Sequence, residues 1–214
     1  MTNEPAVKRA IVFVDGQNLF FGVKEAFGYQ RPNYDVAKLA VRVCELNGWH
    51  LRDIRFYTGI PDAADNPRWN AFWVSKLSAM GRHGVVVFSR PLRYRNKTVN
   101  LPDGGAHTFL VGQEKGVDIR IALDIVRAVR EKNCDVAVVF SQDQDLSEVA
   151  EEVRLIAKEQ DRWIKIASAY PVSPAALNRR GVNKTDWIKI DRDLYDSCID
   201  PKDHWPKPVN RDPK

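Results

Sequence analysis

The sequence predicts an α/β fold in which helices flank a mainly parallel sheet that carries one inserted hairpin. Short apolar runs of strand length alternate along the chain with amphipathic segments of helical period, the pattern of such folds. One polar, glycine-containing stretch, residues 90–112, breaks this alternation. At 214 residues the chain is long enough for one domain with a buried core and short for two. We expect a domain over 9–200, an N-terminal tail over 1–8 and a proline-rich, mobile tail over 201–214.

The predicted strands are the apolar runs. The first of them, RAIVFV, ends abruptly in Asp15-Gly16, as a buried parallel strand and its exit turn do. Ser89 closes the third strand, and the last is an edge strand. In chain order the strands are 9–14, 54–58, 84–88, 135–140, 163–167 and 187–190.

The predicted helices have apolar residues at steps of three and four. They are expected over 18–27, 35–46, 66–80, 118–130 and 146–158. Asp35 is a natural N-cap for the second of them. Between the third strand and the fourth helix, two extended segments flank Asp103-Gly104-Gly105, which predicts a hairpin.

Composition limits the classes of function. A net charge of +5 and a pI near 9.1 suit a polyanionic partner. The three cysteines lie far apart and the histidines lack zinc-ligand spacing, so we expect buried thiols at Cys44 and Cys134 and no structural zinc. No apolar run has the length of a membrane span, and the polar N-terminus does not have the pattern of a signal peptide. We therefore expect a cytoplasmic protein that does not interact with a membrane.

Acidic residues follow two strands and open one helix. Asp15 comes directly after the first strand, Asp143 and Asp145 follow the strand 135–140, and Asp118 begins a helix. In a parallel sheet such positions meet at the carboxyl edge. Two carboxylates about 4 Å apart repel by roughly 4 kcal/mol at an effective dielectric near 20. The side chains must therefore splay apart, take up protons or bind a cation.

An all-oxygen site favours Mg²⁺ or Mn²⁺ over zinc. We predict Asp15, Asp118 and Asp143 as the metal ligands, with the Asn18 amide and the Ser141 hydroxyl in support. Such a cation activates water and neutralises charge on a phosphodiester.

Each acid also has a structural interpretation. Asp15-Gly16 fits an Asx-type turn, Asp118 fits an N-cap, and Asp145 with Glu148 fits a capping box. Asp124 lies six residues beyond Asp118, on another helix face, and is expected to be solvated or ion-paired. Three acids at one sheet edge of a basic chain together favour the metal site.

Three ordered segments resemble motifs of the NYN domain family, a branch of the PIN-like nuclease superfamily. The segment VFVDGQN at 12–18 resembles its φDGxN opening, and 115–124, KGVDIRIALD, is similar to its KGVD…LxxD segment with isoleucine in place of leucine. SQDQDL at 141–146 is similar to its SGDxDF loop. The resemblance runs from about Arg9 to Ala167. One departure is Gln142, where the family usually has glycine, which allows positive φ.

The resemblance implies a PIN-like three-layer sandwich and divalent-cation-dependent cleavage of RNA. It implies metal-holding acids at Asp15, Asp118 and Asp143, with Asp145 as a fourth. Together with Asn18, these are the candidate catalytic residues.

Candidate RNA contacts come from basic residues. Arg90, Arg93 and Arg95 lie in a stretch without acids, with Tyr94 as a stacking ring, and Lys115 adjoins the acidic centre. The alternative interpretation of the first group is a solvated hairpin. A second basic cluster, at Arg179, Arg180 and Lys184, has a solvated loop as its alternative interpretation.

The sequence leaves two functions open. One is a metal-dependent ribonuclease; the other is an RNA-binding or adaptor module of the same fold with little cleavage, which the glutamines at 142 and 144 favour. Dinucleotide, P-loop and α/β-hydrolase chemistry lack their GxGxxG, GxxxxGK[ST] and GxSxG motifs. RNA is the expected partner, and a homodimer is an open alternative to a monomer.

Overall fold

A six-stranded parallel sheet forms the centre of the molecule. The computed structural model describes residues 3–100 and 105–207. The strand order is β3-β2-β1-β6-β7-β8, and every neighbouring pair is parallel, as predicted. The strands are β1 (Arg9–Asp15), β2 (His50–Ile60), β3 (Val86–Pro91), β6 (Val136–Phe140), β7 (Lys165–Pro171) and β8 (Asp186–Ile190).

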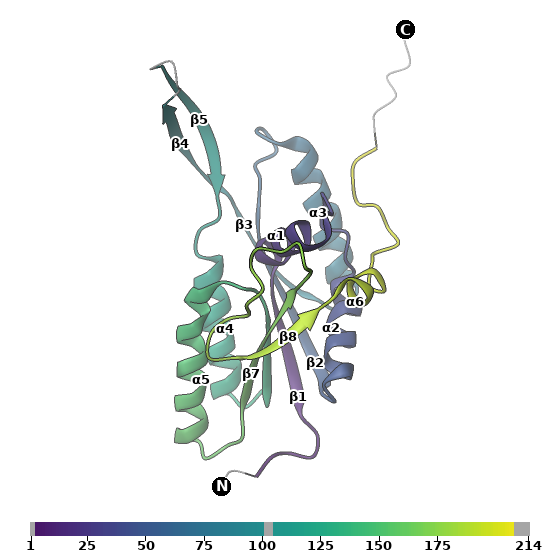
Figure 1. The fold of residues 1–214 in the computed structure, drawn as a ribbon, viewed down its shortest axis with the longest axis vertical. Helices are drawn as coiled ribbons and strands as arrows, with labels where there is room; N and C mark the ends of the chain where they lie inside the picture. The colour runs from purple at the N-terminus through teal and green to yellow at the C-terminus, as the bar shows by residue number, and fades with distance from the viewer. Residues whose placement is uncertain (1–2, 101–104, 208–214) are drawn as a thin grey trace.

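Helices cover both faces of this sheet, which confirms the three-layer sandwich (Figure 1). One face packs against α1 (Gly16–Phe27), α2 (Val36–Leu46), α3 (Pro67–Arg82) and the short α6 (Arg192–Asp196); the other packs against α4 (Val117–Arg130) and α5 (Ser147–Glu159). Strand β1 shows the alternation that requires two layers. Val12 and Val14 enter the first core, whereas Ile11 and Phe13 enter the second.

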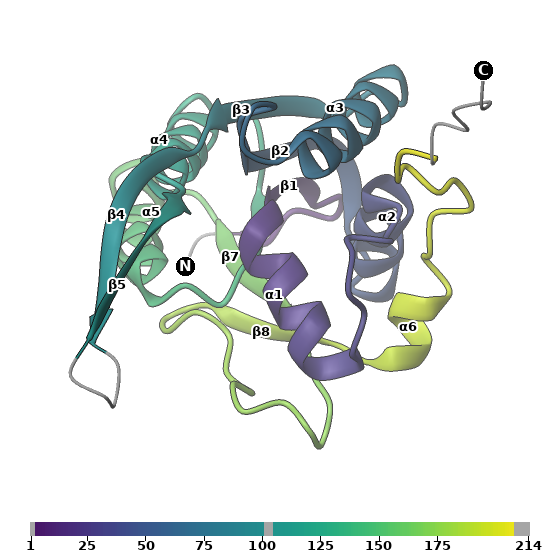
Figure 2. The ribbon, with the colours of Figure 1, turned by 90° about the horizontal axis from the view of Figure 1, so that it is seen from above.

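The inserted segment is a hairpin, as predicted. β4 (Arg93–Asn100) and β5 (Ala106–Gln113) pair antiparallel and form their own two-stranded sheet. In Figures 1 and 2 this hairpin extends away from the rest of the domain. Of its predicted turn, Asp103 and Gly104 lie outside the described residues.

Several predicted boundaries shift because backbone pairing continues past the apolar residues. β2 begins at His50 rather than at 54, and β3 continues to Pro91 instead of ending at Ser89. A 3₁₀ turn over Gln144–Leu146 precedes α5, and α6 was not predicted because five residues carry too little periodicity. Cys44 and Cys134 are buried free thiols, as predicted, and so is Cys198. In the part of the chain that the structure describes, no helix is long and apolar enough to cross a membrane.

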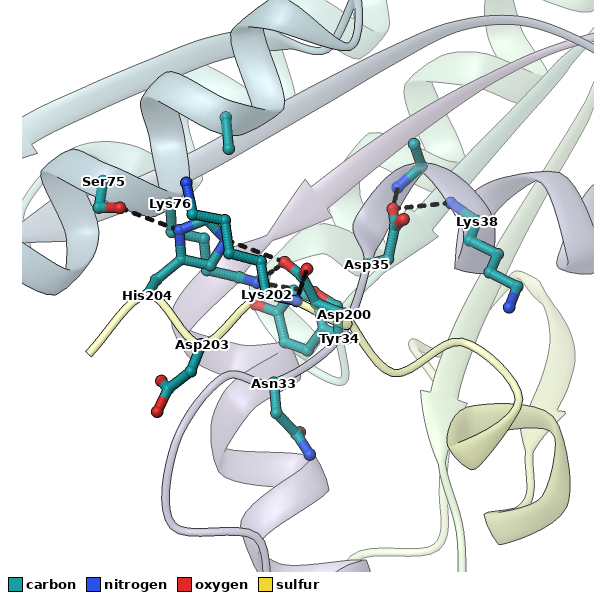
Figure 3. A network of polar contacts seen from close by, with 12 residues as sticks. Asn33, Tyr34, Asp35, Lys38, Ser75, Lys76, Asp200, Lys202, Asp203 and His204 are labelled. Carbon is teal, nitrogen blue, oxygen red and sulfur yellow. Dashed lines mark hydrogen bonds and ion pairs between the residues drawn. The ribbon is translucent and has the colours of Figure 1, made fainter.

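Residues 201–207, the described part of the predicted mobile tail, pack against α3. His204 is buried, and its ring joins Ser75 Oγ (3.0 Å from Nδ1) to Asp200 Oδ2 (3.0 Å from Nε2). Asp200 also accepts from Lys76 Nζ at 3.1 Å, as Figure 3 shows. The proline and charge content behind the predicted mobile tail does not reveal this buried contact, and the mobility of the segment stays a prediction.

Candidate active site

A cavity opens where the connections of two neighbouring strands diverge. The chain leaves β1 into α1 on one face of the sheet, and it leaves the adjacent β6 towards α5 on the other face. Such a switch point at the carboxyl edge forms a ready-made crevice. The cavity has a volume of about 520 Å³. It is lined by Asp15, Gln17, Asn18, Phe21, Glu114, Lys115, Gly116, Val117, Asp118, Ile119 and Asp143.

Asp15 is held rigidly at the end of β1. Its Oδ1 accepts from the backbone N–H of Asn18 at 3.0 Å, which caps α1, and its Oδ2 accepts from Ser141 Oγ at 3.3 Å. Gly16 is required next to it, because a Cβ there would lie 2.5 Å from the Phe56 ring. The pKa of Asp15 is raised to about 6, chiefly by burial and also by the charges of Asp143 and Asp118, while the hydrogen bonds from Asn18 and Ser141 oppose the shift.

The loop after β6 brings Asp143 to the same cavity. The Asp143 backbone N–H donates to Ser141 Oγ at 3.1 Å, so one hydroxyl connects Asp143 with Asp15. Asp143 Oδ1 accepts from the Asp145 N–H at 3.0 Å and caps the 3₁₀ turn. Asp145 itself is exposed and does not line the cavity. The predicted capping box is wrong, since the N-cap of α5 is Leu146, without a side-chain hydrogen bond.

The two glutamines of this loop connect it to the segment 178–183. Gln142 Nε2 donates to the carbonyl oxygens of Asn178 (3.2 Å) and Arg180 (2.9 Å). Gln144 Nε2 donates to the Gly181 carbonyl at 3.1 Å. Gln142 is not among the described residues with positive φ, so no glycine is needed at this position.

The side chain of Asn18 positions the loop rather than a carboxylate. Its Oδ1 accepts from the backbone N–H of Gln142 at 2.8 Å, and only its backbone N–H holds Asp15. This refines the prediction, in which the amide of Asn18 held an acid or a water.

Asp118 is exposed in the first turn of α4 and is not its N-cap. The N-cap is Gly116, with φ 72° and no side-chain cap. A Cβ on Gly116 would also lie 2.8 Å from the Arg90 guanidinium, so both backbone and space favour glycine. Asp124, six residues on, faces the core side: it is 5% exposed, accepts from Tyr57 Oη at 3.0 Å and pairs with Arg120 at 2.9 Å. It is ion-paired, as one alternative had it, but not solvated.

Glu114 is a cavity carboxylate that was not among the residues predicted from the sequence. Its Oε1 is buried without a hydrogen-bond partner among the described residues. Its pKa is raised to about 8, chiefly by burial and also by the charges of Asp15 and Asp118, while a hydrogen bond from the Gly59 N–H opposes the shift. Its position at the exit of β5, four residues before Asp118, was the one available signal.

Asp15, Asp118 and Asp143 line one cavity but do not form a tight cluster. Within residues 3–100 and 105–207, no three acidic, histidine or cysteine side chains are gathered as a metal-binding group. Burial is the main cause of the raised pKa values of Asp15 and Glu114, and the neighbouring carboxylates add to both shifts. The donor set is nevertheless all oxygen, and the unpaired Glu114 Oε1 points to a missing positive partner. These residues therefore fit a hard divalent cation.

The predicted RNA contacts separate into two groups. Lys115 lines the cavity, and Arg90 lies against Gly116 beside it. Arg93 and Arg95 are exposed on the hairpin, away from that lining. Tyr94 has a structural contact, because its hydroxyl accepts from the backbone N–H of Asp62 at 2.9 Å and its ring lies against Gly112.

Comparison with protein families decides the assignment. The NYN domain model matches residues 9–178, which contain β1, the whole cavity and the β6 loop. The chain belongs to the NYN domain family. This family is part of the PIN-like nuclease superfamily, so a nuclease-like, RNA-related function applies to the NYN domain at the family level.

Solved structures add support for the fold. The NYN domain is similar to a protein of unknown function from Vibrio parahaemolyticus, at 19% identity over 90% of this chain and 98% of that one, with a TM-score of 0.54. It also matches ribokinase from Giardia lamblia, at 11% identity over 81% of this chain and 53% of that one, but the TM-score of 0.38 is too low to indicate a shared fold. Comparison with curated proteins gives no match.

Glu114 predicts a pH-dependent stability of the metal-free NYN domain. Between its ordinary pKa of 4.5 and its folded pKa of about 8, the unfolded chain releases the proton that the folded chain keeps. Stability therefore falls as pH rises through this window. Glu114→Gln is expected to remove the contribution of Glu114 to this fall and to leave that of Asp15, so that the urea midpoint of the variant in EDTA gains on that of the parent from pH 5 to 8. Glu148→Gln, at an exposed carboxylate of α5, is the control and should show no such trend. If the difference in urea midpoint between Glu114→Gln and the parent stayed the same from pH 5 to 8, the prediction would be contradicted.

Proposed function

We propose that the chain is a metal-dependent ribonuclease that hydrolyses RNA phosphodiester bonds, with Mg²⁺ or Mn²⁺ as its cofactor. Asp15, Asp118 and Asp143 hold the cation, and Glu114 takes the fourth acidic position. The observation that carries the proposal is one cavity in which these carboxylates face a lysine and the start of a long helix. Such a cavity binds a cation and a phosphate together.

The chain's own residues fix where the cation is held. The Ser141 hydroxyl holds Asp15 and Asp143 near each other, because it donates to the Asp15 carboxylate and accepts from the Asp143 N–H. Asp118 is exposed at the cavity, and its side chain has no hydrogen-bond or ion-pair partner within the part of the chain that the structure describes. When bound, a hard divalent cation activates a water molecule and neutralises the charge that develops on the phosphodiester.

Phosphate recognition has two sources beside the carboxylates. The N-terminus of α4, at Gly116 and Val117, lines the cavity without a side-chain cap, so its N–H groups and the helix dipole favour an anion. Lys115 contributes a charge at the same place. Phe21, 58% exposed at the lining, offers a ring to an unpaired base.

The adaptor module is the second candidate. In the sequence, the glutamines of the β6 loop favoured it, but in the structure they tie that loop to the segment 178–183 and leave Asp143 at the cavity. This geometry favours the nuclease.

The test is cleavage of labelled RNA. We expect single-stranded and hairpin RNAs to be cut in Mg²⁺ or Mn²⁺ and to stay intact in EDTA. Salt-sensitive binding with no product in either metal would instead establish the adaptor. Product that survives both EDTA and the Asp143→Asn substitution would come from a contaminating nuclease and would count against the proposal.

The remaining expectations belong to the same proposal. We place the enzyme in the cytoplasm, as the sequence composition suggests, with RNA as its substrate. A homodimer stays a prediction.

A further inference from the structure

The β4–β5 hairpin has two chemically different faces. Side chains alternate along each strand, and directly paired residues share a face. The register Arg93↔Gln113, Arg95↔Val111, Lys97↔Phe109 and Val99↔His107 therefore places the odd-numbered residues of both strands together. We call this set the cationic face. The even-numbered residues, among them Leu110, form the opposite face.

The cationic face carries positive charge that the carboxylates of the described residues do not neutralise. Arg93, Arg95 and Lys97 are exposed, and none has an ion pair within the part of the chain that the structure describes. Elsewhere arginines are commonly neutralised by carboxylates, as Arg162 is by Asp135 at 3.1 Å. Residues 93–100 and 105–113 contain no aspartate or glutamate. A row of unpaired cations of this kind matches a phosphate backbone.

The same face also carries aromatic rings beside the cations. Phe109 is 40% exposed, and its ring is stacked on that of His107, with centroids 6.0 Å apart and planes at 26°. Phe109 is directly opposite Lys97. Exposed rings next to cations form the combination that binds single strands, because the ring stacks on a base while the cations contact phosphates.

The opposite face, as far as its residues are described, has no lysine or arginine and no exposed aromatic ring. It carries Asn96 and a Thr98–Thr108 hydroxyl pair, whose oxygens are 2.8 Å apart, together with Leu110. Tyr94 on this face is held against Gly112 and hydrogen-bonded to the Asp62 N–H. The stacking ring of the hairpin is therefore Phe109 rather than the predicted Tyr94.

The hairpin leads directly to the cavity. β5 ends at Gln113, and the next two residues, Glu114 and Lys115, line the cavity. Eight residues of antiparallel strand span about 27 Å. A strand bound along this face thus continues to the acidic edge of the sheet, from which the hairpin rises in Figure 1.

We propose that the cationic face of the hairpin binds an unpaired RNA strand and guides it into the cavity. The strand must be unpaired because a duplex hides the base faces on which Phe109 would stack. The inference rests on the proposed function only for what happens at the cavity; the binding itself needs no metal and no cleavage.

The test measures binding in EDTA, where the proposed reaction cannot proceed. The fluorescence anisotropy of a labelled single strand of about twelve nucleotides is compared with that of its duplex, using the full chain. We expect the single strand to bind more tightly, and Phe109→Ala to weaken it about tenfold, the effect of one lost base stack. Leu110→Ala, the neighbouring residue on the opposite face, should change the affinity less than about twofold.

The charge contribution has its own control. Lys97→Gln should reduce the slope of log affinity against log salt by about 0.7, the value for one phosphate contact of a single strand. Lys38→Gln, at an exposed lysine of α2, should leave the slope unchanged.

Two binding results would overturn the inference: Phe109→Ala and Leu110→Ala lose the same affinity for the single strand, or the duplex binds as tightly as the single strand. A third concerns polyglutamate as a probe. If Lys97→Gln weakened the binding of polyglutamate more than that of RNA, the face would be assigned to an acidic protein. Binding as expected without cleavage in Mg²⁺ would overturn the nuclease proposal alone. Cleavage without any Phe109 effect would overturn this inference alone.

Discussion

Asp118→Asn is expected to lower the rate of metal-dependent RNA cleavage by about a thousandfold and to leave the fold intact. A bound cation contributes several kcal/mol of charge stabilisation, and each 1.4 kcal/mol is about a factor of ten in rate. Asp118 is the best of the acids for this test because it is exposed and its side chain has no partner among the described residues. Asparagine keeps its shape and removes only the charge.

The control is Glu131→Gln, which removes one carboxylate just beyond the far end of the same helix and should retain the parent rate within about twofold. Initial rates at saturating Mg²⁺ are compared with the affinity for RNA in EDTA. We expect Asp118→Asn to keep that affinity or to gain slightly, because the substitution removes a charge that repels phosphate. A variant that still cleaves within a factor of ten of the parent would exclude Asp118 as a metal ligand.

Asp200→Ala is expected to destabilise the fold by about 3 kcal/mol, the lower end of the effect of removing one partner of a buried ion pair, because the Asp200 side chain is itself 19% exposed. Lys76 is 1% exposed, and its Nζ donates to the Tyr34 carbonyl oxygen at 2.8 Å and to Asp200 Oδ2 at 3.1 Å (Figure 3). Burial lowers the pKa of Lys76, and the charge of Asp200 opposes this shift. Without Asp200, the Tyr34 carbonyl oxygen is the one hydrogen-bond acceptor that the described residues leave to this ammonium.

Lys76→Met is the matched comparison, because it removes the buried charge and keeps much of the side-chain volume. Asp200 then still accepts from the Lys202 N–H (2.9 Å) and contacts the His204 ring, so the loss should be clearly smaller. Asp203→Ala, at an exposed neighbour, controls for changes in this segment. Urea unfolding at pH 7 gives the free energies. If Asp200→Ala lost no more stability than Lys76→Met, the buried pair would not be what holds residues 201–207 to α3.

Local patterns in the sequence were sufficient to predict the sandwich. Apolar runs and helical periods gave the main strands and helices, and Asp35 was correctly predicted as an N-cap, since its carboxylate accepts from the N–H groups of Ala37 and Lys38. Bounds were less accurate because strand pairing extends along the backbone past the apolar residues, as at His50.

For the candidate site, the sequence by itself determined which segments meet. Asp15, Asp118 and Asp143 follow strands or open a helix, and the parallel order of the sheet brings such positions to one edge. The three NYN motifs contain these same residues, so they too can be recognised from short stretches of sequence.

Only the tertiary structure decided the environment of each carboxylate. The buried, unpaired oxygen of Glu114, the hydroxyl bridge through Ser141 and the exposure of Asp145 all depend on which distant segments pack around them. Burial and hydrogen bonding set the pKa of a carboxyl group and its freedom to bind a cation, and neither can be seen in the order of residues along the chain.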